Sequence, residues 1–197
     1  MRVLVMGSTG SGKSTFARQL AARIGAPHIE QDALNWDPGW TDLSHADPEK
    51  LRERVRAAIM AESWTTCGNY SAVRGLILER ATHLVWLDYE RPIIMARVIR
   101  RSLSRAIVNA ELWPGTGNRE DFRRWLDKEH PIRWAWDTFK ARRMSYEQMF
   151  ADPANARLEM DRVRHPRQAA PLMDRLAAAE RRPIPCSSVA VPAVNEE

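Results

Sequence analysis

The chain has 197 residues and a formal net charge of +5, with 44% hydrophobic and 28% charged residues, which is typical of one soluble globular domain. Its two cysteines, Cys67 and Cys186, lie far apart, which excludes a disulfide scaffold and a zinc finger. The apolar run at residues 3–6 is too short for a signal peptide or a membrane span. We therefore expect a cytoplasmic protein that binds no membrane.

The first half of the chain alternates short β-prone runs with helical patterns. One helical pattern ends at Gly25, and a second begins at Pro48, a residue suited to the first helical position. Residues 35–47 contain tryptophan, proline and glycine close together and are predicted to form a loop. Strands are predicted over residues 2–6, 27–30 and 64–67.

The second half continues this alternation with longer helices. A fourth strand is predicted over residues 84–88 and a weak fifth strand over residues 157–160, whereas proline and glycine exclude regular structure at 112–118. Residues 182–197 hold three prolines and are predicted to be a disordered tail. Strands that alternate with helices indicate a parallel α/β sheet, here in one domain over residues 1–181. The helices are predicted over residues 91–109, 119–128, 131–150 and 166–181.

Residues 7–14 read Gly-Ser-Thr-Gly-Ser-Gly-Lys-Ser and match the phosphate-binding loop G-x-x-x-x-G-K-[ST] at every required position. The match lies between a predicted strand and a predicted helix, so its backbone N–H groups and the helix start would face one centre. Lys13 would reach the β- and γ-phosphates, and the Ser14 hydroxyl would bind Mg²⁺. We therefore expect ATP and Mg²⁺ as cofactors, with the nucleotide bound by Gly7, Ser8, Thr9, Gly10, Ser11, Gly12, Lys13, Ser14, Thr15 and Arg97.

The positive charge is concentrated in the middle of the chain. Residues 91–143 carry 13 basic and 6 acidic side chains, and 11 of the 13 are arginine. Arginine suits bidentate phosphate contacts, so a phosphorylated small molecule and a nucleic acid are both open as partners, beside the alternative of a solvated helical surface. Arg97, Arg101 and Arg105 have the spacing that places them on one helix face.

Missing motifs exclude other classes of P-loop protein. The chain has neither the Asn-Lys-x-Asp nor the Asp-x-x-Gly motif of GTPases, and no hydrophobic strand ends in the Asp-Glu of large motor ATPases. A short chain with an N-terminal P-loop, acidic residues after the second strand and arginines in a lid indicates the small kinase type. We predict this helical, arginine-rich lid at about residues 105–124.

Further segments resemble the adenylate kinase-like P-loop kinases called topology modulation proteins. The strings that carry the resemblance are Asp-Ala-Leu-Asn-Trp at 32–36 and Gly-Asn-Tyr-Ser at 68–71, and the likeness covers about residues 1–180. The resemblance implies a five-stranded parallel sheet in the order 2-3-1-4-5 flanked by helices, as in nucleoside-monophosphate, shikimate and gluconate kinases. It does not fix the phosphoryl acceptor, and no residue pattern supports the reading of DNA bases.

The resemblance also implies roles for the acidic residues after the second strand. In similar kinases an acidic pair here holds Mg²⁺-bound water and orients or deprotonates the acceptor hydroxyl. Asp32 is therefore predicted to be catalytic, and Glu30 is predicted to bind the metal together with Ser14. The alternatives are a cap or turn residue for Asp32 and a solvated side chain for Glu30.

Cys67 departs from the related kinases, which usually carry Asp in an Asp-Gly pair at the end of this strand. A neutral thiol cannot supply that charge, so metal binding would rest on Ser14 with Glu30 or Asp32. The departure puts the rate of phosphoryl transfer in question more than ATP binding. The alternative is that Cys67 is a small buried apolar side chain.

Arginines from both sides of the lid complete the predicted catalytic set, which is Lys13, Asp32, Arg101 and Arg133. In kinases of this type, arginines at the start of the lid cover the adenine and phosphates, and a second group of arginines approaches from the other end of the lid. Further candidates for this second group are Arg119, Arg123, Arg142 and Arg143.

Three other features have two interpretations each. Asn69, Tyr70 and Arg74 would line the acceptor pocket or form a structural turn. His165 and the proline after it would hold adenine through backbone groups or begin a helix. Tryptophans in and near the lid would stack on a ligand base or, as we favour, pack in the core; they are Trp36, Trp40, Trp113, Trp125, Trp134 and Trp136.

Together these features predict a monomeric or weakly dimeric kinase that transfers the γ-phosphoryl group of Mg-ATP to a small acceptor, such as a nucleotide or nucleoside. The alternative is a regulatory ATP-binding protein or ATPase that acts on nucleic acid through its basic middle segment. Acidic residues interrupt that segment, which argues against a continuous DNA track. A nucleic-acid binder would also lose affinity steeply with salt.

Overall fold

The computed structural model describes residues 1–108, 111–119, 127 and 130–181. The disordered tail expected at 182–197 lies outside the described residues, as does nearly all of the helix expected at 119–128. No helix in the described part of the chain is long and apolar enough to cross a membrane.

A five-stranded parallel sheet forms the centre of the molecule, with the strand order β2-β5-β1-β6-β7. β1 lies in the middle, and its Val5 is opposite Cys67 on one side and Val85 on the other. In chain order this is the predicted arrangement 2-3-1-4-5, so the expected α/β fold class is confirmed. The strands are β1 (Arg2–Gly7), β2 (His28–Glu30), β5 (Trp64–Cys67), β6 (His83–Leu87) and β7 (Glu159–Val163).

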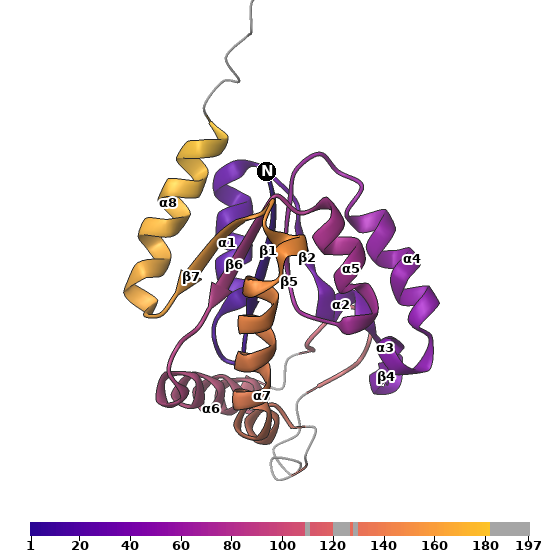
Figure 1. Ribbon diagram of the computed structural model, residues 1–197. Coiled ribbons are helices and arrows are strands. Elements are labelled where there is room, and N and C mark those ends of the chain that lie inside the picture. The colour runs from indigo at the N-terminus through magenta and orange to yellow at the C-terminus, as the bar shows by residue number, and fades with distance from the viewer. Residues whose placement is uncertain (109–110, 120–126, 128–129, 182–197) are drawn as a thin grey trace, which may run out of the picture.

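Helices cover both faces of the sheet (Figure 1). In β1, Val3 and Val5 face one hydrophobic cluster, and Leu4 and Met6 face the other. Because both faces are covered, β1 is apolar over residues 3–6 and the strand at residues 84–87 is apolar as well, which is typical of buried parallel strands. The first cluster includes α1 (Lys13–Ile24) and α8 (Ala169–Glu180), and the second includes α4 (Pro48–Ala58) and α5 (Ser71–Arg80).

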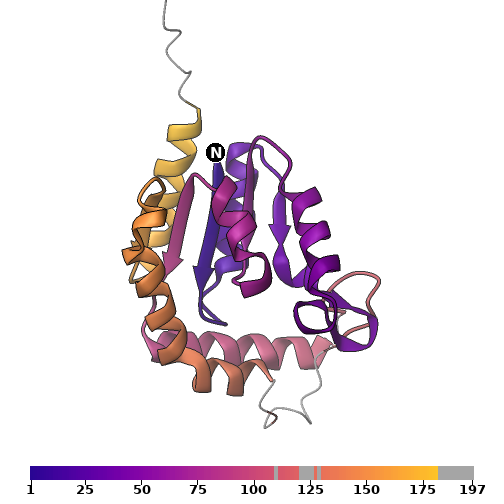
Figure 2. The ribbon, with the colours of Figure 1, turned by 45° about the vertical axis from the view of Figure 1, so that its right-hand side comes forward.

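Two long helices lie beyond the carboxyl ends of the strands. Figure 2 shows α6 (Arg91–Val108) running below these ends, from the β7 side of the sheet toward the short helices on the opposite side. α7 (Pro131–Ala151) returns beside α6 and continues along the sheet, where Tyr146 packs edge-on against Trp86. Ligands of open α/β sheets bind at the carboxyl ends of the strands, so α6 borders the expected site.

The segment after β2 folds into a small hairpin between short helices. Its Asp37 forms ion pairs with Lys50 and Arg54 of α4, at 2.7 and 2.8 Å. The prediction of a loop over residues 35–47 is therefore wrong in part, because contacts with α4, which no local pattern shows, order the segment. The elements are α2 (Gln31–Asn35), β3 (Trp36–Asp37), a 3₁₀ turn (Pro38–Trp40), β4 (Thr41–Asp42) and α3 (Leu43–Ala46).

Two other elements differ from expectation. The fifth strand begins at Glu159 rather than at residue 157, because its register on β6 starts with Glu159 opposite His83. No prediction was made for α5, whose middle holds Gly75 and whose buried residues are Val73 and Ile77. A glycine inside a short helix weakens the pattern by which helices are predicted.

Candidate nucleotide and acceptor site

Residues 7–14 form the turn between β1 and α1, at the carboxyl end of the central strand. The Ser11 N–H donates to the Ser8 carbonyl at 3.0 Å, and the Phe16 N–H donates to the Gly12 carbonyl at 2.9 Å. Gly12 precedes α1 in the left-handed conformation and has no side chain with which to cap the helix. The N–H groups of the first turn therefore stay open to an anion, as a phosphate site requires.

The loop lies tightly against α6. A side chain at Gly10 would meet the Ile94 carbonyl at 2.7 Å, and Gly10 has a φ of +91°, so glycine is required there. Arg97 of α6 donates to the Ser11 carbonyl at 3.0 Å, and its guanidinium lies 5.2 Å from the centre of the Tyr89 ring. Arg97 therefore lies beside the loop. Its contact with the nucleotide stays a prediction.

Lys13 is half-buried at the start of α1. Its ammonium group makes no hydrogen bond or ion pair with any residue in the described ranges. A partly buried cation without a carboxylate suits a phosphate group as its partner. Together with the open helix start, this arrangement fits the triphosphate of ATP. Thr15, also predicted to bind the nucleotide, is exposed in the same first turn.

Cys67 lies at the hydroxyl that is expected to bind Mg²⁺. Its thiol donates to the Ser14 hydroxyl at an Sγ–Oγ distance of 3.3 Å. Burial, partly offset by the hydrogen bond to Ser14, raises the pKa of the thiol to about 11, so it is neutral at pH 7. The strand order therefore brings Cys67 to the P-loop as predicted, and the thiol supplies no negative charge there.

The donors for Mg²⁺ near this point are few. In the part of the chain that the structure describes, no group of three or more His, Cys, Asp or Glu side chains could hold a metal ion. Mg²⁺ in kinases usually takes one or two carboxylates together with phosphate oxygens and water. Near Ser14 the carboxylates that could serve are those of Glu30 and Asp32.

Glu30 and Asp32 lie on either side of the junction between β2 and α2. The Glu30 carboxylate is 3.5 Å from Arg18, and Glu30 rather than Asp32 is the cap residue of α2. Asp32 accepts a hydrogen bond from the Tyr70 hydroxyl at 2.8 Å. Both carboxylates are near enough to Cys67 to act electrostatically on its thiol.

The candidate arginines have different surroundings. Arg133 forms an ion pair with Asp137, one turn along α7, at 2.7 Å. Arg143 is 3.1 Å from the buried carboxylate of Asp88, which gives it a structural partner, whereas Arg123 lies outside the described residues. The spacing of the α6 arginines places them together as predicted. A surface hollow of about 470 Å³ is lined by Arg97, Arg100, Arg101, Ser104 and Arg105.

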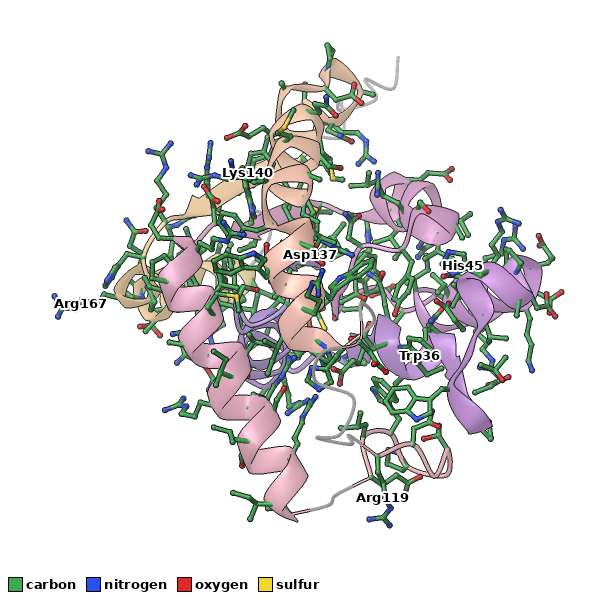
Figure 3. The ribbon with its side chains drawn as sticks, turned by 90° about the horizontal axis from the view of Figure 1, so that it is seen from below. Trp36, His45, Arg119, Asp137, Lys140 and Arg167 are labelled. Atoms are coloured by element: carbon green, nitrogen blue, oxygen red, sulfur yellow. The ribbon has the colours of Figure 1, made fainter. Side chains whose placement is uncertain are left out.

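Three tryptophans form a cluster at the hairpin that follows α2. The rings of Trp36 and Trp113 stack with 6.1 Å between their centres, and Trp40 packs edge-on against both. Asn118 joins the same segments, since it accepts the Trp40 N–H at 3.0 Å and donates to the Asp37 carbonyl at 3.2 Å. Residues 111–119 therefore dock on the hairpin, and Figure 3 shows Trp36 next to the segment that carries Arg119.

These rings pack on one another at the surface, where Trp40 is 39% exposed, so the expectation that they pack in the core is wrong. Trp134 and Trp136 are exposed on α7, and Trp125 lies outside the described residues. His165 caps a short 3₁₀ helix (Pro166–Gln168), which fits the interpretation of a helix start. No sequence pattern indicates the role of Asn118, because its partners lie far along the chain.

Comparison with known proteins finds a shikimate kinase among curated sequences. No known protein-family profile matches the chain. A curated shikimate kinase of Symbiobacterium thermophilum is 29% identical over 117 residues, which cover 53% of this chain and 67% of that one.

Solved structures agree in fold. A shikimate kinase from Acinetobacter baumannii in complex with shikimate has a TM-score of 0.56 at 16% identity, covering 90% of this chain and 91% of that chain. A shikimate kinase from Bacteroides thetaiotaomicron has a TM-score of 0.54 at 14% identity, covering 91% and 97%. The fold is that of a P-loop kinase. The sequence relative and the complete phosphate-binding loop indicate a phosphotransferase.

Proposed function

We propose that this P-loop kinase transfers the γ-phosphoryl group of Mg-ATP to a hydroxyl group of a small acceptor, such as a nucleotide or nucleoside, and that it belongs with the topology modulation proteins. The observation that carries the proposal is the contact of Cys67, at the end of β5, with the Ser14 hydroxyl of the phosphate-binding loop, close enough to Lys13 and Asp32 for both charges to act on the thiol. A cation, a metal-binding hydroxyl and a carboxylate in one place are the parts that position a nucleophile beside a γ-phosphate.

Each residue would have a separate task. Lys13 and the open start of α1 would bind the β- and γ-phosphates, and Ser14 and Glu30 would hold the metal and its water. Mg²⁺ would offset the negative charge that builds up on the phosphates. Asp32 would orient the acceptor hydroxyl or accept its proton. Arg97 would add positive charge beside the loop.

Arg101 and Arg133 remain proposed catalytic residues. Arg101 shares the hollow on α6 with Arg97, which supports a role near the phosphates. Arg133 would have to exchange Asp137 for a phosphate group in order to act. An arginine that reaches the transferring group is worth about 10³–10⁵ in rate.

The lid and the acceptor pocket are proposed on either side of this centre. We assign the lid to about residues 105–124. Residues 105–108 form the end of α6, and residues 111–119 contact the hairpin through Asn118. Arg74 donates to the Asn69 side chain at 2.7 Å, beside Tyr70 and the carboxylate of Asp32. This placement supports an acceptor pocket between α2 and the start of α5.

The test is ADP release from Mg-ATP in the presence of a panel of candidate acceptors. The panel contains nucleoside monophosphates, nucleosides, shikimate and gluconate. We expect at least one of them to raise ADP release well above the rate in buffer, and Lys13→Ala to abolish the increase. Stimulation by duplex DNA alone, lost steeply as salt rises, would instead support the nucleic-acid alternative.

A further inference from the structure

The turn after β5 is fixed to the helix that carries Asp32. The buried Gln31 side chain accepts the Tyr70 backbone N–H at 3.5 Å, and its amide nitrogen lies 3.4 Å from the Thr66 hydroxyl. A side chain at Gly68 would meet Gln31 at 2.7 Å, and Gly68 has a φ of +138°, so the close approach requires glycine. The backbone of Tyr70 is therefore held in place relative to α2.

The Tyr70 side chain makes a second contact with α2. Its hydroxyl donates to Asp32 at 2.8 Å, and both side chains are half-buried. Burial, followed by the negative charge of Asp32, raises the pKa of Tyr70 far above its usual range, so the hydroxyl keeps the proton that it donates. A carboxylate has two oxygens, and the one that Tyr70 does not bind is left for another hydroxyl.

We propose that Tyr70 is a positioning residue whose hydroxyl holds the Asp32 carboxylate with its second oxygen toward the acceptor hydroxyl. This inference rests on the proposed kinase function, in which Asp32 orients or deprotonates the acceptor. Tyr70 acts through Asp32 and does not touch the reacting atoms. A misplacement of about 1 Å at a reacting centre costs roughly 100-fold in rate, so a loose Asp32 would lower kcat strongly.

A double-mutant cycle of Tyr70→Phe and Asp32→Ala tests the inference with two readouts. The first readout is kcat and KM for ATP, measured as ADP release with the best acceptor of the panel, together with Mg-ATP affinity by calorimetry. The second readout is the equilibrium constant of unfolding in urea, which needs no acceptor. Thr41→Val is the control, because it removes an exposed hydroxyl of the hairpin that bonds only the Pro38 carbonyl among the described residues.

We expect Tyr70→Phe to lower kcat by about 10- to 100-fold, with KM for ATP and ATP affinity within about twofold of wild type. In the Asp32→Ala background the same change should not lower kcat further. The combined effect of the two changes on the equilibrium constant of unfolding should also differ from the product of the single effects by roughly tenfold, as a hydrogen bond to a charged group implies. Thr41→Val should leave both readouts at their wild-type values.

Three outcomes would overturn the inference. Additive losses in kcat would mean that Tyr70 acts on the acceptor directly, and an unchanged kcat in Tyr70→Phe would mean that it does not position Asp32. If the effects of the two substitutions on the free energy of unfolding are additive, the two side chains do not interact. If no acceptor supports transfer by the wild type, the kinase proposal fails by itself, and the unfolding cycle still decides whether Tyr70 holds Asp32.

Discussion

The thiol of Cys67 lies where the proposed function would have a carboxylate assist Mg²⁺. It bonds the Ser14 hydroxyl, and the positive charge of Lys13 acts on it from the same loop. Because burial keeps the pKa of the thiol near 11, the group is uncharged over the whole physiological pH range. Weak Mg²⁺ binding and slow turnover are the expected consequences.

Cys67→Asp should therefore increase the rate of ATP turnover and lower the Mg²⁺ concentration needed for half-maximal rate. A side chain that contacts a metal through its bound water typically changes metal affinity or activity by about 10- to 100-fold. Burial and the charges of Glu30 and Asp32 oppose ionisation of the new carboxylate, whereas the charge of Lys13 and a bound Mg²⁺ would favour it. The measurement is ATP turnover against Mg²⁺ concentration, with the melting temperature recorded beside it.

Cys67→Ser is the matched control, because it keeps a small neutral side chain at the same place. Its Mg²⁺ profile should equal that of the wild type. If the folded Asp variant shows the same profile as the Ser variant, Cys67 does not lie at the metal site.

At the scale of single residues, the sequence predicts contacts that lie within one continuous motif or that follow from the order of the strands in the sheet. The loop from Gly7 to Ser14 is one uninterrupted pattern, and Cys67 reaches it because β5 lies next to β1. The contact of Tyr70 with Asp32 joins residues 38 positions apart. It depends on the direction in which the first turn of α2 faces, which no pattern in the chain specifies.

At the scale of elements, the docking of residues 111–119 on the hairpin joins two segments that are irregular or short by themselves. Asn118 is 2% exposed and bonds both Trp40 and Asp37, and the ring of Trp113 stacks on Trp36. Buried side-chain amides of this kind need their partners, since an unsatisfied buried polar group costs about 1–3 kcal/mol.

Asn118→Ala should release this segment while leaving the fold intact. We expect backbone amides in residues 111–119 to exchange with solvent roughly tenfold faster or more, because two hydrogen bonds that hold the segment are lost. The Leu112 N–H, which donates to the Asn118 carbonyl at 2.9 Å, is a direct reporter. Hydrogen exchange read by mass spectrometry measures the effect, with the melting temperature as a check on the fold.

The same experiment on Thr41→Val controls for general loosening of the hairpin. That variant should show wild-type exchange in residues 111–119. Equal exchange in Asn118→Ala and wild type would mean that the docking contact does not hold the segment.

The elements themselves were predictable where one feature dominates. Apolar runs predict β1 and β6, because both sheet faces are covered, whereas β5 is predicted by its β-prone residues before Gly68. The edge strand β7 is harder, since its Asp161 and Arg162 interrupt the apolar run and its register is set by pairing with β6. The hairpin at residues 36–42 is held by Asp37 and by a tryptophan cluster that includes Trp113, so a local reading of the sequence finds only a loop.

At the scale of the whole molecule, one buried carboxylate joins the sheet to α7. Asp88, which follows β6, is 2.7 Å from Arg162 of β7 and 3.1 Å from Arg143 of α7. The Asp88 side chain is 3% exposed, whereas both arginines are partly exposed. Part of the arginine excess in residues 91–143 therefore stabilises the fold rather than contacting a ligand.

Asp88→Ala should lower the free energy of unfolding by roughly 3 kcal/mol, because it leaves two arginines without their shared buried partner. Chemical denaturation measures the change. Asp174→Ala is the control, since its ion pair with Arg23 is exposed and pairs of that kind contribute about 1 kcal/mol or less. Similar losses in the two variants would show that Asp88 is not a structural anchor.

The central claim is that the P-loop, Asp32 and the acceptor pocket together move a phosphoryl group. The most direct measurement is the fate of the label from γ-³²P ATP in the presence of Mg²⁺ and the acceptor that most increases ADP release. We predict that the wild type places the label on the acceptor and that Lys13→Ala transfers none. Label found only in inorganic phosphate, or transferred equally by Lys13→Ala, would contradict the account.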